Sequence, residues 1–225
     1  MSNPSSLLTA AAVDEVFGDG GAVRPSAASL PAGVTHRATR EFLTRVGLPA
    51  ELRGRAAVVH RPDDPGWTPL PALREEIGKH GWAWTMPERP EHRFCIGTIF
   101  GLGLLTLNGE NGQIWFISES EGGLTLLHKN VESLAYYMYA IERNAKKYSA
   151  SYAMSIDEKP DDPREEFDVY MEGARALAVE LHTIDPAPFA HGPGEPWGDD
   201  GEGPWAWMIR EMSEGAWAEW PRKEM

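Results

Sequence analysis

Apolar residues gather in short β-rich runs between residues 94 and 129, and turns that contain glycine separate these runs. Short runs of this kind between turn residues are typical of β-strands. The turn at residues 108–112 contains two Asn-Gly pairs, which suit the positive φ angles of tight hairpin loops. The segment therefore predicts consecutive antiparallel strands, a β-meander that serves as a scaffold.

Helical periodicity dominates the chain before the meander. Residues 5–17 predict a short helix closed by Gly18, and the Gly/Pro/Ala/Ser-rich stretch up to Gly33 predicts a loop. A second helix is expected to be capped by Thr35 and to end at Gly47, because a proline follows two residues later. Weaker patterns predict strands at residues 56–59 and 81–86 and a short helix at residues 70–79.

Three further helices are predicted after the meander. Asn130 is placed to cap the first, whose apolar residues recur at helical spacing. The second covers residues 164–182 and has an apolar stripe that begins at Phe167. The third covers residues 204–214 and presents Trp205, Met208, Ile209 and Met212 on one face. The polar, proline-bearing segments at residues 149–163 and 186–203 predict loops.

These elements predict an α+β fold, with a mixed or antiparallel sheet of about five to six strands and flanking N- and C-terminal helices. Residues 1–29 are expected to form an N-terminal helix and linker. Residues 30–220 are expected to form a single domain with an acidic loop at 149–165 and a Gly/Pro-rich insert at 186–203. A chain of 225 residues with 42% hydrophobic content can bury one such core.

The composition favours a cytoplasmic protein. No apolar run is long enough to predict a transmembrane helix, and the N-terminus carries acidic residues where a secretory signal needs basic ones. Cys95 is the only cysteine, so no intrachain disulfide can form, which is consistent with a reducing compartment.

The net charge of −13 belongs almost entirely to the C-terminal third, where residues 150–225 carry 18 acidic and six basic side chains. Such a field repels nucleic acid and favours a basic protein partner, although a merely solubilising surface is the alternative. Tryptophans are also concentrated there, and interface hot spots favour this residue. The candidate partner-binding residues are Asp157, Asp161, Asp162, Glu165, Glu166, Asp199, Asp200, Trp197 and Trp207.

The sequence offers no convincing catalytic, metal or cofactor site. The seven histidines form no i, i+4 pair within a helix, and Gly101-Leu102-Gly103 lacks the third glycine and the following helix of a dinucleotide site. Cys95 sits between Phe94 and Ile96 in a predicted strand, where a small buried residue is the usual occupant. We therefore expect no cofactor and no metal, and a non-enzymatic protein.

Six short segments, taken in order, form a pattern of apolar residues and turns that is similar to that of a known family. They are residues 39–43, 46–49, 96–97, 105–113, 184–186 and 205–212. Together they resemble the fourth immunity family of the SUKH superfamily over roughly residues 30–217. The chain departs from that family's pattern at residues 156–166 and 191–203, which we expect to vary with the partner.

The resemblance implies a mixed sheet surrounded by helices and a protein that neutralises a polymorphic toxin of competing bacteria, commonly a nuclease or a nucleic-acid deaminase. It implies no catalytic residues and no membrane association. Two alternatives remain open at this level. One is a regulatory module on the same scaffold that binds a cellular protein or peptide, and the other is a hydrolase that uses Cys95.

Overall fold

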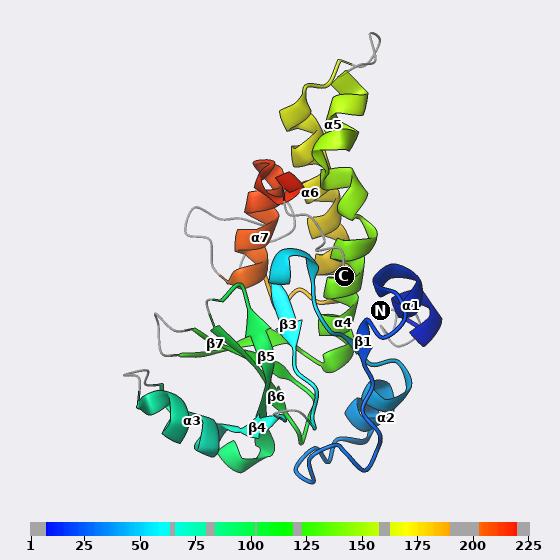
Figure 1. The fold of residues 1–225 in the computed structure, drawn as a ribbon. Helices are drawn as coiled ribbons and strands as arrows, with labels where there is room; N and C mark the ends of the chain where they lie inside the picture. Colours follow the sequence, from blue (N-terminus) through cyan, green and yellow to red (C-terminus); the bar gives the residue numbers. More distant parts are fainter. Residues whose placement is uncertain are drawn as a thin grey trace. The chain divides into compact units, whose positions relative to one another are not determined.

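The computed structural model describes residues 8–63, 66–79, 84–101, 103–118, 123–157, 163–189 and 203–219 (Figure 1). The fold is α+β, as predicted. The chain divides into two compact units, residues 1–138 and residues 139–225. The expected division into residues 1–29 and 30–220 stays a prediction.

An antiparallel sheet forms the centre of the first unit (Figure 1). Its strand order is β3-β5-β6-β7-β8, and β4 also pairs with β5. The predicted meander is confirmed, with successive strands joined by turns in which Gly101 and Gly112 have φ angles of +65° and +79°. The strands are β3 (Ala57–Val59), β4 (Thr68–Pro69), β5 (Arg93–Ile99), β6 (Gly103–Asn108), β7 (Ile114–Ser118) and β8 (Leu124–His128).

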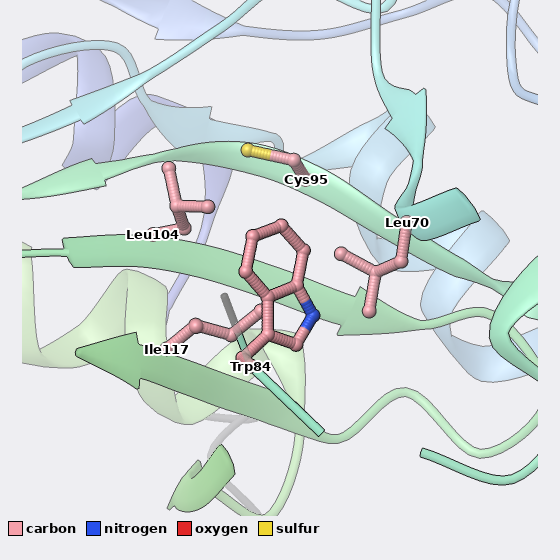
Figure 2. Packing of buried hydrophobic residues seen from close by; sticks show 5 residues of the cluster. All are labelled: Leu70, Trp84, Cys95, Leu104 and Ile117. Carbon is pink, nitrogen blue, oxygen red and sulfur yellow. The ribbon is translucent and has the colours of Figure 1, made fainter. Parts of the chain in front are cut away.

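One face of this sheet is covered by an apolar cluster (Figure 2). Leu70 opens helix α3 (Leu70–Gly78) and meets Trp84 over the side chains of Cys95, Leu104 and Ile117, which come from three adjacent strands. All five are buried. Burial of this kind is the main favourable contribution to folding, so α3 is held on the sheet chiefly by its apolar side.

The chain before the sheet forms helix α1 (Ala10–Phe17), helix α2 (Arg37–Arg45) and a two-stranded ribbon of β1 (Ala22–Val23) and β2 (Leu48–Pro49). The prediction that Thr35 caps α2 was wrong. The N-cap is His36, and the backbone N–H groups of Thr35 and His36 both donate to the carbonyl of Gly109 at 2.8 Å. Tertiary pairing with the β6–β7 turn therefore sets where α2 begins. Short 3₁₀ turns lie at η2 (Arg53–Arg55) and η3 (Pro90–His92).

Helix α4 (Val131–Arg143) begins in the first unit and ends in the second. Asn130 caps it as predicted, because its Oδ1 accepts a hydrogen bond from the Ser133 N–H at 2.9 Å. The second unit continues with η4 (Ala145–Tyr148), α5 (Ala150–Asp157), α6 (Glu166–Ile184), α7 (Pro204–Ser213) and η5 (Ala216–Glu219). Within it, α6 packs against both α5 and α7.

Helix α7 confirms the predicted stripe, since Trp205, Met208, Ile209 and Met212 are all fully buried. No helix among the described residues is long and apolar enough to span a membrane.

Two further local predictions were wrong. The segment 149–163 was expected to be a loop, yet residues 150–157 form α5, which begins where the Tyr152 N–H donates to the hydroxyl of Ser149 at 3.2 Å. Residues 81–86 were expected to form a strand. Residues 81–83 lie outside the described part. Residues 84–86 form no strand, and the Trp84 side chain packs in the apolar cluster with Leu70.

Candidate interaction surface

The start of α6 is the best-defined polar feature of the second unit. Glu165 occupies the N-cap position, and its side chain accepts a hydrogen bond from the backbone of Asp168. In return the Asp168 carboxylate accepts from the Glu165 N–H at 3.1 Å. This reciprocal capping box satisfies two backbone donors at the helix start, and its negative charges are favourable beside the positive end of the helix dipole.

An open depression of about 560 Å³ lies beside this helix start and is lined by Glu165, Glu166, Phe167, Tyr170 and Glu214. The Tyr170 hydroxyl donates to Oε1 of Glu166 at 2.8 Å and so fixes that carboxylate. Glu214 reaches the depression because α7 ends here and Gly215, at a φ angle of +79°, lies close against the Tyr170 ring. A β-carbon at Gly215 would stand 2.8 Å from Cε2 of that ring.

Phe167 is the unexpected member of this surface. The sequence placed it at the start of the apolar stripe of α6, whose later members Tyr170, Ala174 and Leu177 are buried as expected. Phe167 instead leaves 53% of its area exposed. Phe167 lies about one turn before Tyr170, which is the first buried member of the stripe. The apolar stripe of α6 therefore begins before the part of the helix that is covered.

Two of the three carboxylates that line the depression with Phe167 are not neutralised by neighbouring cations. Glu214 pairs with Arg210 at 3.3 Å, whereas Arg164 pairs with Glu172 at 3.0 Å, outside the lining. Within the described part of the chain, Glu165 and Glu166 form no ion pair. An exposed aromatic ring beside two unpaired carboxylates is suited to a partner that brings basic side chains and an apolar contact.

The described structure brings together only part of the predicted site. Glu165 and Glu166 line the depression, whereas Trp207 lies half-buried in α7. Asp157 ends α5. Asp161, Asp162, Trp197, Asp199 and Asp200 lie outside the described residues.

Sequence reasoning missed Tyr170 and Glu214 as surface-forming residues. Tyr170 was read only as part of a buried stripe, and the Tyr-to-Glu spacing of four residues along a helix was the available signal. Glu214 has no local signal, because its place beside α6 depends on how α6 and α7 pack.

The described residues contain no arrangement that suggests catalysis. Cys95 is buried, and burial raises the pKa of its thiol to about 11. The thiol donates a hydrogen bond to the carbonyl of Gly97 at 3.6 Å. A nucleophilic cysteine needs a lowered pKa and access to substrate, and Cys95 has neither. Among the residues that the structure describes, no three His, Cys, Asp or Glu side chains come together in a way that could hold a metal ion.

Comparison with known proteins gives one match. The family model described as SUKH-4 immunity protein matches residues 8–209, which include every helix and strand from α1 to α6 and most of α7. No curated protein and no solved structure matches the chain.

Proposed function

Because the chain belongs to the SUKH-4 immunity protein family, we propose that it binds one cognate bacterial toxin in the cytoplasm and blocks that toxin's active site. The family match carries this proposal, and the absence of a catalytic arrangement among the described residues is compatible with inhibition by binding alone. The protein acts as a stoichiometric inhibitor and needs no cofactor.

The toxin-binding surface in this proposal includes the start of α6. Glu165 and Glu166 supply negative charge, and Phe167 supplies an exposed apolar ring in the same depression. The neighbouring acidic candidates at positions 157, 161 and 162 extend the same stretch of sequence. A surface that combines charge with one large aromatic side chain matches the composition of protein interfaces better than a purely solubilising one.

The charge indicates the kind of toxin. A nuclease or a nucleic-acid deaminase must bind a polyanion, so its active-site cleft carries lysine and arginine. An acidic immunity protein complements that cleft and associates with it faster at low salt. We therefore propose a basic toxin domain that acts on nucleic acid.

Co-expression with a candidate toxin domain from the neighbourhood of this gene tests the proposal. We expect the chain to rescue growth and to co-purify with the toxin in a one-to-one complex. Failure to rescue, together with capture of a different cellular protein, would favour the regulatory binding module instead.

A second experiment tests the surface. Replacing Glu165 and Glu166 together by glutamine removes two charges while keeping the oxygen acceptors that cap α6 and hold Tyr170. We expect weaker toxin binding and a smaller dependence of affinity on salt. The matched control replaces Glu75 and Glu76, two exposed neighbouring carboxylates of α3, by glutamine. Equal affinities of the two variants would refute this placement and leave the immunity role standing.

A further inference from the structure

A stacked pair of side chains lies on one face of the sheet in the first unit. Cys95 is paired with Thr106, and Thr106 with Trp115, so these residues point to the same face. Arg93 stands two residues before Cys95 on β5 and shares that face. Its guanidinium carbon lies 4.9 Å from the centre of the Trp115 ring, within the range of a cation–π contact.

The donors of this pair are unused. Nε and Nη1 of Arg93 and Nε1 of Trp115 are covered by protein atoms, and none has a hydrogen-bond partner among the described residues. Buried polar groups are nearly always hydrogen-bonded, and a buried charged group without an acceptor is especially unfavourable. Three buried donors without acceptors on two contacting side chains are therefore an exception to this rule, and the exception needs a physical explanation.

The nearby acidic groups do not supply the acceptor. Glu110 forms an ion pair with Arg89, and Glu91 lies 3.7 Å from Nε2 of His92. Burial lowers the pKa of the Arg93 guanidinium, and the more distant charge of Glu110 offsets this only in part. Arg93 nevertheless stays a cation at neutral pH, because arginine is not deprotonated in proteins.

We propose that Arg93 and Trp115 form a subsite for a carboxylate group of a protein partner. The Arg93 side chain has no hydrogen bond to lose, so it can turn outward from the Trp115 ring and meet the carboxylate with its planar donors. The indole N–H of Trp115 supplies a second hydrogen bond to the same carboxylate. Where the partner is the toxin, this subsite rests on the proposed function. It then supplies one positively charged contact in addition to the negatively charged contacts of the acidic surface.

A phosphate group would use the same donors, yet the surroundings favour a carboxylate. Recognition of a nucleic-acid backbone relies on several cations, whereas the charged group shown to act on Arg93 is the carboxylate of Glu110. The net charge of −13 also repels a polyanion. A single aspartate or glutamate side chain inside a protein interface meets less of this repulsion.

Nuclear magnetic resonance of the nitrogen-15-labelled full chain tests the subsite without any toxin. Sodium acetate is the probe, sodium chloride at equal ionic strength is the control, and a Trp115→Phe variant assigns the indole signal. We expect acetate to shift the Trp115 indole N–H and the Arg93 Nε–H saturably, and Arg93→Met to abolish the indole shift. The matched variant is Arg37→Met, which removes an exposed cation paired with Glu41, and it should keep the shift. An equal shift with chloride, or one that persists in Arg93→Met, would overturn the subsite, as would a larger response to inorganic phosphate.

Thermal unfolding separates ligand binding from a structural role. Because Arg93 is a desolvated cation without a hydrogen-bonded acceptor, Arg93→Met should leave the melting temperature unchanged or raise it. A clearly lower melting temperature would show that the stacked arginine is structural and would overturn the proposal. A negative acetate result leaves the immunity role untouched, and a failed co-expression test leaves the acetate result untouched.

Discussion

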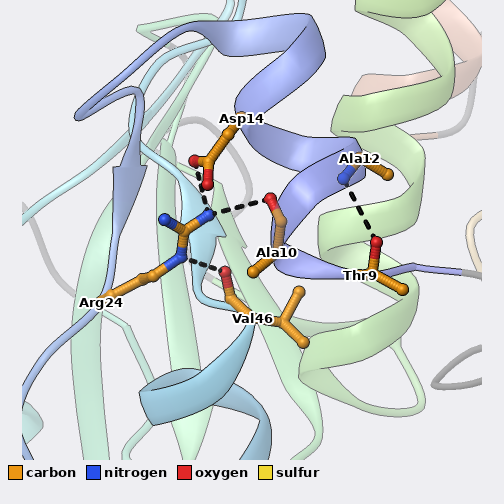
Figure 3. A network of polar contacts seen from close by, with 6 residues as sticks. All are labelled: Thr9, Ala10, Ala12, Asp14, Arg24 and Val46. Carbon is orange, nitrogen blue, oxygen red and sulfur yellow. Dashed lines mark hydrogen bonds and ion pairs between the residues drawn. The ribbon is translucent and has the colours of Figure 1, made fainter.

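Arg24 and Asp14 form an ion pair in which Nη2 of the arginine lies 2.7 Å from Oδ1 of the carboxylate (Figure 3). The same guanidinium donates to the carbonyl of Ala10 at 3.3 Å and, through Nε, to the carbonyl of Val46 at 2.7 Å. One half-buried side chain therefore connects α1 to the end of α2. It also satisfies backbone carbonyl groups in both places.

Replacing Arg24 by methionine should destabilise the first unit. The change leaves the Asp14 carboxylate and two carbonyl groups without this donor, and the loss of charged hydrogen bonds in such a place is about 1–3 kcal/mol. Urea unfolding followed by tryptophan fluorescence measures it. The control is Arg37→Met, which breaks the exposed pair of Arg37 with Glu41 and should have no measurable effect. Similar behaviour of both variants would contradict the structural role of Arg24.

Gly97 should be irreplaceable where β3 joins the sheet. It sits at a bulge in β5 opposite Val59, and a β-carbon there would stand 2.0 Å from the carbonyl oxygen of Val58. Gly97→Ala must push β3 away, and we expect a loss of about 3 kcal/mol in the free energy of unfolding. Gly78→Ala is the control, because nothing lies within 4 Å of its new β-carbon and alanine favours the helix. A mild effect at position 97 would refute the proposed steric limit.

Patterns that depend on neighbouring residues predicted the fold well. The apolar runs in residues 94–129 and the glycine turns between them locate the strands of the meander, and the spacing of Trp205 and Met208 identifies the buried side of α7. Both patterns are visible in the sequence because each is formed by residues close together in the chain. The capping of α4 by Asn130 is equally local.

Features that depend on distant contacts were not predicted. The start of α2 is set by the carbonyl of Gly109, more than 70 residues later in the chain, and Trp84 leaves a strand-like pattern to fill the core under α3. The candidate surface was not fully predicted for the same reason. Glu214 joins Glu166 beside Phe167 only because α7 packs on α6, and no spacing in the sequence contains that information.

The thiol of Cys95 should react only when the protein opens. Its pKa of about 11 lies above the ordinary value of 9.0, so the folded protein retains a proton there that the unfolded chain loses between pH 9 and 11. Stability should therefore fall as pH rises through this range, and at pH 8 a thiol reagent should modify the native protein at the rate of opening. Mass spectrometry follows the modification. Fast labelling of the folded chain would contradict the burial and reopen the hydrolase alternative.

Phe167→Ala should separate binding from stability at the candidate surface. More than half of this ring is exposed, so removing it exposes little new core and should change the free energy of unfolding by less than about 1 kcal/mol. If the ring anchors the toxin, affinity should fall at least about tenfold, as for an aromatic hot spot. Val179→Ala is the matched control, because Val179 is 50% exposed on the same helix. Isothermal titration with the neighbouring toxin domain measures both variants. Equal affinities would remove Phe167 from the interface, whereas a selective loss in Phe167→Ala would place the start of α6 at its centre.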